Sequence, residues 1–217
     1  MAGKEMLLEN LGALWFLASS CLCFVTFRRM RKSACWNRYG ARLFLVLSLL
    51  FFAAFGEEIS WGQHWFHFST PQSIQDLNQQ DEINLHNLRV FDSRTANGER
   101  RGGLMFLLNS NRLFDYFMVV FIVLPPLTVK WWSDNPIRSD ATRTAGLIFP
   151  FLFLLAINYM MTFAWLLATD SPAIADGTSE IRESNNALLI LAVCIYWTIS
   201  VSSSSWEGRN PVDARND

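Results

Sequence analysis

The sequence predicts an all-α, polytopic membrane protein in which about five helices form a bundle. Half of the chain (51%) is hydrophobic, and these residues gather in blocks. Each block is close to the roughly 20 residues that a helix needs to cross a bilayer. The blocks lack the alternating pattern of barrel strands, and only helices or closed barrels satisfy backbone polar groups in lipid. We therefore expect one integral membrane domain covering residues 1–217.

Five apolar blocks give the predicted membrane spans. They cover approximately residues 7–27, 43–62, 113–129, 145–168 and 187–206. The basic cluster follows the first block rather than preceding it, so we interpret this block as a retained anchor and not as a secretory signal. The net charge of −1 gives no reason to expect nucleic acid or another polyanion as a partner.

Basic residues in the short loops predict the orientation. The loop between the first two spans carries six basic residues and no acidic one: Arg28, Arg29, Arg31, Lys32, Arg38 and Arg42. The positive-inside rule places this loop, the loop after the third span and the C-terminal tail on the cytoplasmic side. The N-terminus and the loops 63–112 and 169–186 are then expected outside.

Two adjacent carboxylates, Glu57 and Glu58, are the sharpest chemical signal in the chain. Counted along a helix from Arg42, they lie roughly 22–24 Å into an apolar layer about 30 Å thick. Charges at that depth are costly and indicate a functional site. On a continuous helix the two acids point in different directions. They meet at one ligand only if the helix breaks near Gly56 or Gly62.

The segment after the carboxylates is unusual for an external loop. Thr70-Pro71 is typical of a helix start, and we expect a short helix from there to about Gln79. Polar and apolar residues alternate around 82–88. We therefore interpret 63–112 as an outer interfacial segment, with 63–91 folded over the outer ends of the helices. The sequence leaves open whether 103–112 belongs to the third span or forms a separate interfacial helix.

Three short motifs carry a family resemblance: Gly-Glu-Glu-Ile-Ser-Trp-Gly-Gln at 56–63, Thr70-Pro71, and Asn-Leu-His-Asn-Leu at 84–88. Together they resemble a family of uncharacterised bacterial polytopic membrane proteins. The resemblance covers 56–88 and implies a multi-pass protein of the bacterial inner (plasma) membrane. It also implies one outer constellation of nine residues: Glu57, Glu58, Ser60, Trp61, Gln63, Glu82, Asn84, His86 and Asn87. The family has no activity to transfer.

These residues give the candidate site. The candidate catalytic groups are Glu57, Glu58 and His86, with a carboxylate as general base and the histidine as acid or orienting group. The candidate substrate-binding residues are Ser60, Gln63, Glu82, Asn84 and Asn87. His64 and His67 are weak metal-ligand candidates beside Glu57. However, the family pattern has arginine where this chain has His64 and has no counterpart of His67, so we assign no metal. Cofactors stay open.

Polar groups on later helices could complete the site, among them Asp115 at the start of the third span. The helix dipole explains Glu180 and Glu183 more simply, and interhelical hydrogen bonding explains Asn158 and Tyr159.

Three functions fit the sequence. The first is an outer-face carboxylate and histidine cluster that acts on a lipid or lipid-linked substrate. The second is a non-catalytic membrane scaffold or complex subunit, in which the same cluster only locks the outer loop onto the bundle. The third is a proton-coupled transporter, which requires a polar path through the inner half of the helices.

Overall fold

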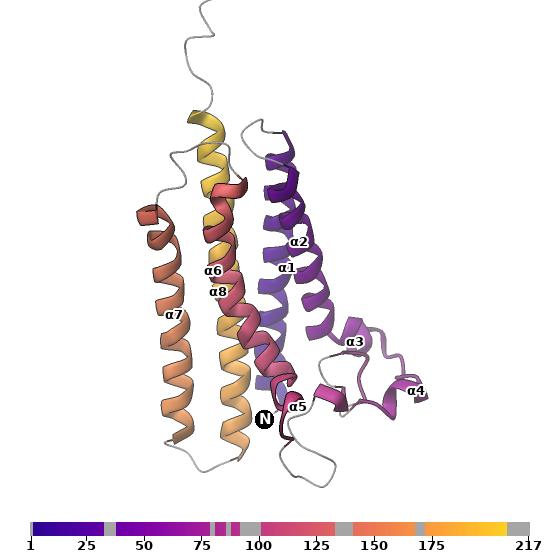
Figure 1. The fold of residues 1–217 in the computed structure, drawn as a ribbon. Helices are drawn as coiled ribbons and strands as arrows, with labels where there is room; N and C mark the ends of the chain where they lie inside the picture. Colours follow the sequence, from indigo (N-terminus) through magenta and orange to yellow (C-terminus); the bar gives the residue numbers. More distant parts are fainter. Residues whose placement is uncertain are drawn as a thin grey trace, which may run out of the picture.

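The chain is all-helical in the computed structural model, which describes residues 2–32, 38–78, 81–85, 88–91, 101–132, 141–167 and 172–207 (Figure 1). The predicted fold class is confirmed at this level. The long helices are α1 (Ala2–Lys32), α2 (Arg38–Glu58), α6 (Ser110–Trp132), α7 (Ala141–Leu167) and α8 (Pro172–Glu207). Between α2 and α6 lie the short elements η1 (Ser60–Gly62), α3 (Gln63–Phe66), α4 (Gln72–Gln75), η2 (Arg89–Phe91) and α5 (Leu104–Leu107).

Four stretches of these helices are long and apolar enough to cross a membrane. They are Asn10–Lys32, Tyr39–Glu58, Pro150–Leu167 and Ile181–Val201. Their length and composition suit a multi-pass membrane protein. The predicted third span, 113–129, lies within helix α6.

Some element boundaries differ from the sequence prediction. Helix α2 ends at Glu58 rather than at residue 62, because the next residues turn left-handed. Helix α8 starts at Pro172 rather than at 187, so the expected outer loop 169–186 is largely helical. Proline is well suited to the first turn of a helix, and this first half of α8 is too polar for a hydropathy window to detect. Helix α5 is separate from α6, and α4 ends at Gln75 rather than near Gln79.

Helix α1 packs against both α2 and α8, and α8 also packs against α7. Aromatic rings fill the interior where α1, α2, α6 and α8 meet. Phe51 of α2 stacks edge-on against Phe121 of α6, with ring centroids 5.3 Å apart, and Phe121 contacts Trp197 of α8 at 5.0 Å. Phe51 is almost fully buried. This apolar core fixes the position of helix α2, whose last turn carries Glu57 and Glu58.

Small polar side chains join the helices beside the aromatic core. Ser20 and Ser48 each donate to the other's backbone carbonyl, at 2.8 and 2.9 Å, which ties α1 to α2. Thr26 bonds Thr198 of α8 at 2.9 Å between hydroxyl oxygens. Small hydroxyl residues let helices approach closely and bond across an apolar interface.

The segment between α2 and α6 lies toward the same end of the bundle as the N-terminus (Figure 1). Helices α3 and α4 project sideways from the end of α2, on the side away from α7 (Figure 1). The described residues that follow α2 therefore lie beside the end of the bundle (Figure 1).

Candidate functional site

The chain reverses directly after the carboxylate pair. Ser60, Trp61 and Gly62 all have positive φ, at 46°, 53° and 81°. Left-handed backbone costs a side-chain-bearing residue roughly 1–2 kcal/mol, so the first two positions need support from their surroundings. The Trp61 ring supplies some of it by folding back onto Gly56, where a Cβ would stand only 2.8 Å from the ring. Glycine at 56 is therefore required by the close approach of the indole.

Glu57 joins the end of α2 to the returning chain. Its Oε1 accepts a hydrogen bond from Trp61 Nε1 at 2.8 Å, and its Oε2 accepts one from the backbone N–H of Leu85. Glu58 points elsewhere, because its Oε2 lies 4.0 Å from the Cβ position of Gly12 on α1. The helix does break, as the convergence of the two acids required, but the break leaves them on different faces.

A second carboxylate, Glu82, completes a buried polar cluster. Its Oε2 accepts hydrogen bonds from Ser60 Oγ at 2.6 Å and from Asn84 Nδ2 at 2.7 Å. Ser60 is 2% exposed and Asn84 is 4% exposed. Sharing two donors stabilises a partly desolvated carboxylate, since hydrogen bonds to a charged oxygen are the stronger kind.

Gln63 uses both ends of its amide. Its Oε1 accepts from the backbone N–H of Ile83 at 2.8 Å, and its Nε2 donates to Thr70 Oγ1 at 2.8 Å and to the carbonyl of Asp81 at 3.2 Å. Thr70 in turn donates to the same Asp81 carbonyl. The threonine that the sequence suggested as a helix cap thus closes the turn at Asp81, which is itself left-handed at φ 55°.

Asn78 belongs to this network although sequence reasoning missed it. It is 1% exposed, and its Nδ2 donates to the carbonyl and to the Oδ1 of Asn84, at 3.0 and 3.1 Å. It also pairs with Leu88 in an isolated β-bridge. An asparagine in a polar segment gives no signal of burial, so only the fold reveals this contact.

The remaining predicted site residues stay untested. His86 and Asn87 lie outside the described residues, as does the side chain of His64. His67 is exposed and left-handed, at φ 54°. Among the side chains that the structure describes, no group of three His, Cys, Asp or Glu is placed to hold a metal ion.

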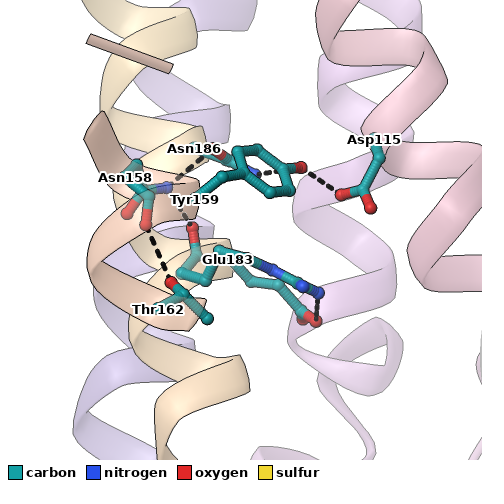
Figure 2. Close-up of polar contacts among 7 residues, drawn as sticks. Asp115, Asn158, Tyr159, Thr162, Glu183 and Asn186 are labelled. Atoms are coloured by element: carbon teal, nitrogen blue, oxygen red, sulfur yellow. Dashed lines mark hydrogen bonds and ion pairs between the residues drawn. The ribbon is translucent and has the colours of Figure 1, made fainter. Parts of the chain in front are cut away.

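A second polar cluster joins α6, α7 and α8 (Figure 2). Tyr159 of α7 donates its hydroxyl proton to Asp115 of α6, and Asn186 of α8 donates to the same hydroxyl at 3.4 Å. Asn158 donates to Asn186 Oδ1 at 2.9 Å and accepts from Asn185 Nδ2 at 3.0 Å. The expectation of interhelical bonding at Asn158 and Tyr159 is therefore confirmed.

Arg182 of α8 is the cation of this second cluster. Its guanidinium lies 5.6 Å from the centroid of the Tyr159 ring, and its Nη2 stands 3.8 Å from Glu183 Oε1. Glu183 was among the polar residues expected from the sequence, whereas Arg182 was not predicted. The signal was available, because Arg182 is the one basic residue between Arg143 and Arg209.

Comparisons with protein families, with curated proteins and with solved structures found no match to this chain. The resemblance of residues 56–88 to a bacterial membrane family therefore stays a prediction.

Proposed function

We propose that this chain is a non-catalytic scaffold of a bacterial inner membrane, with the N-terminus and the outer segment 63–112 on the outer face. One observation carries the proposal. Apart from Glu58, the described candidate catalytic and substrate-binding side chains all bond to the chain itself: Glu57, Ser60, Gln63, Glu82 and Asn84. Their bonds connect the end of α2 to residues 81–85. They thereby fix the segment 59–91, which is otherwise mostly loop and is called the platform below.

The composition of the platform supports a locking role for these bonds. Among the described residues 59–91 no apolar side chain is buried, whereas Ser60, Thr70, Asn78 and Asn84 are. Burial of apolar surface is the usual source of stability in a folded unit. Because the apolar side chains of this segment are at most partly buried, hydrogen bonds worth about 0.5–1.5 kcal/mol each contribute much of what holds the platform together. Removing one is then expected to loosen the whole segment.

The exposed side of the platform is strongly apolar. Trp65 is 59% exposed and Phe66 is 75% exposed, and Leu77 and Leu85 are exposed as well. Tryptophan and other large apolar residues gather at the membrane–water boundary. The platform is therefore suited to lie in the outer interface of the bilayer beside α2.

The orientation rests on the charge pattern. The basic cluster that includes Arg29, Arg31 and Lys32 ends helix α1, and α2 starts directly afterwards. This is the end of the bundle opposite the platform (Figure 1). Under the positive-inside rule the cluster faces the cytoplasm, and the platform then faces out.

The catalytic and transport interpretations receive less support. Ser60, the hydroxyl that contacts Glu82 in the candidate site, is buried and already donates to that carboxylate. The buried aromatic core around Phe51 and Phe121 argues against a polar path leading inward from Glu57.

The substitution Glu57→Gln tests the scaffold. Both carboxylate oxygens accept from N–H donors, so an amide must turn its own NH2 group against one of them. We expect a loss of about 1–2 kcal/mol in the stability of the platform. Hydrogen–deuterium exchange of residues 59–91 in the full-length protein should accelerate. The matched control is Asp76→Asn, because Asp76 accepts through one exposed oxygen that asparagine retains.

The outcome separates the two leading functions. Faster exchange in Glu57→Gln, with Asp76→Asn unchanged, supports the scaffold. Unchanged exchange and thermal stability in Glu57→Gln, together with an altered lipid profile of the cells, would instead support an enzyme in which Glu57 acts on substrate.

A further inference from the structure

The guanidinium of Arg182 lacks the hydrogen bonds that its position demands. Arg182 lies near one end of the apolar stretch Ile181–Val201. Its side chain is 17% exposed, and its Nε is buried without a hydrogen-bond partner. The nearest carboxylate oxygen, on Glu183, is 3.8 Å from Nη2, beyond the length of a hydrogen bond. A guanidinium offers five N–H donors, and the one on Nε has no acceptor among the described residues.

The neighbouring groups are bonded to each other rather than to this cation. Asn158 donates to the backbone carbonyl of Arg182 at 3.2 Å and to Asn186 Oδ1 at 2.9 Å. Tyr159 donates to Asp115 (Figure 2). These bonds hold α6, α7 and α8 around Arg182, whose guanidinium stacks on the Tyr159 ring. The surrounding side chains therefore bond to one another, while the Arg182 Nε has no acceptor in the described part of the chain.

Charge limits what the acceptor can be. The ionisable side chains in contact with Arg182 or Tyr159 include two acids, Glu183 and Asp115. Together with the cation their charges sum to −1, so they oppose a dianion about twice as strongly as an oxyanion with a single negative charge. Arginine binds planar pairs of phosphate oxygens through two parallel N–H bonds.

Apolar surface beside the cluster indicates the rest of the ligand. Leu154, Ile157 and Met161 form an exposed stripe on α7 at i, i+3 and i+7 spacing, next to Asn158 in sequence. Only 11% of the apolar stretch Pro150–Leu167 is buried. The end of an apolar stretch is also the depth at which lipid headgroups begin.

We propose that Arg182 binds the phosphodiester of a phospholipid, with the acyl chains lying against the exposed face of α7. The site lies on α6, α7 and α8, whereas the platform follows α2. A test of the lipid site is therefore independent of the scaffold proposal.

The test measures lipid binding to the full-length protein after delipidation in detergent. Phosphatidylglycerol carries both a singly charged phosphodiester and acyl chains, diacylglycerol carries the chains alone, and inorganic phosphate carries the oxyanion alone. We expect phosphatidylglycerol to raise the thermal midpoint and to appear as bound lipid in native mass spectrometry. The other two should do neither.

Variants assign the binding to Arg182. Arg182→Gln should weaken phosphatidylglycerol binding roughly tenfold or more, the effect of losing a charge-assisted bidentate contact. The matched control is Arg42→Gln, because Arg42 is an exposed arginine whose guanidinium also lies near an aromatic ring, 6.0 Å from the Tyr39 centroid. The Arg42→Gln protein should bind phosphatidylglycerol as the wild type does. Glu183→Gln keeps the cation and removes a competing acid, so it should tighten binding.

Two results would overturn the proposal. One is equal phosphatidylglycerol binding by the Arg182→Gln and Arg42→Gln proteins. The other is a thermal shift with inorganic phosphate as large as that with the lipid, which would identify a free oxyanion instead. If Arg182→Gln does not fold, an unchanged affinity in Glu183→Gln rejects the site.

Discussion

The contact between Trp61 and Gly56 makes a quantitative prediction for Gly56→Ala. A Cβ at this position would stand 2.8 Å from the Trp61 ring, and Gly56 lies within helix α2, so the penalty is the clash alone. Overpacking typically costs about 1–3 kcal/mol. A displaced ring also loses its hydrogen bond to Glu57, worth about 1 kcal/mol. Alanine favours the helix by about 1 kcal/mol over glycine, which leaves a net destabilisation of about 1–3 kcal/mol.

The assay is thermal unfolding of the full-length protein in detergent, together with limited proteolysis of the outer segment. For a chain of this size, each kcal/mol corresponds to about 2–4 °C in the thermal midpoint. The matched control is Gly102→Ala, since a Cβ at Gly102 meets no atom within 4 Å. We expect the thermal midpoint of the Gly56→Ala protein to fall by several degrees and its proteolysis to be faster. The Gly102→Ala protein should match the wild type in both measurements.

A double-mutant cycle isolates the contact. Trp61→Ala removes the ring, so adding Gly56→Ala to that background should cost nothing or even stabilise α2. If Gly56→Ala costs the same with and without the ring, or raises the thermal midpoint of the wild-type chain, the Trp61 contact does not explain the glycine.

Three further predictions concern other contacts. Asn84→Ala should lower stability by about 1–3 kcal/mol and speed proteolysis of the outer segment, because buried partners lose their bonds; unchanged proteolysis would contradict the network. Tyr159→Phe removes the hydroxyl that links α6 to α8 through α7, and interhelical bonds of this kind average about 0.6 kcal/mol; a drop of the thermal midpoint beyond about 5 °C would exceed that account. The sulfur atoms of Cys23 and Cys194 lie 3.6 Å apart and buried while Cys21 is exposed, so a small maleimide that enters apolar phases should modify Cys21 in the folded protein before Cys23 or Cys194; equal labelling rates would refute this packing.

The end of α2 shows how much of the site could be predicted from the sequence. Gly56 and Gly62 allowed a break to be anticipated, and the break occurs at 59–62. The left-handed backbone of Ser60 and Trp61 was not foreseeable, because local propensity disfavours it in both. That conformation decides where Glu57 meets Leu85, so the partners of the carboxylate could not be derived from helical phase.

Arg182 is the opposite case, because its sequence context already indicated a functional residue. A lone basic residue beside an apolar stretch is a functional candidate on sequence grounds. Its partners are Tyr159, 23 positions earlier, and Glu183, its neighbour. Only the packing of α7 on α8 shows that its Nε is buried with no hydrogen-bond partner among the described residues.

The sequence by itself determined that this chain is helical, that several of its helices are apolar enough for a membrane, and that its polar chemistry gathers after the second of them. Those properties follow from local composition and backbone hydrogen bonding, which act over one helix at a time. Tertiary structure alone decided that Glu57 and Glu58 point apart, that Glu82 closes onto Ser60, and that Arg182 stacks on Tyr159. These outcomes depend on contacts between distant segments, and their geometry is set only when the chain reverses and the helices pack.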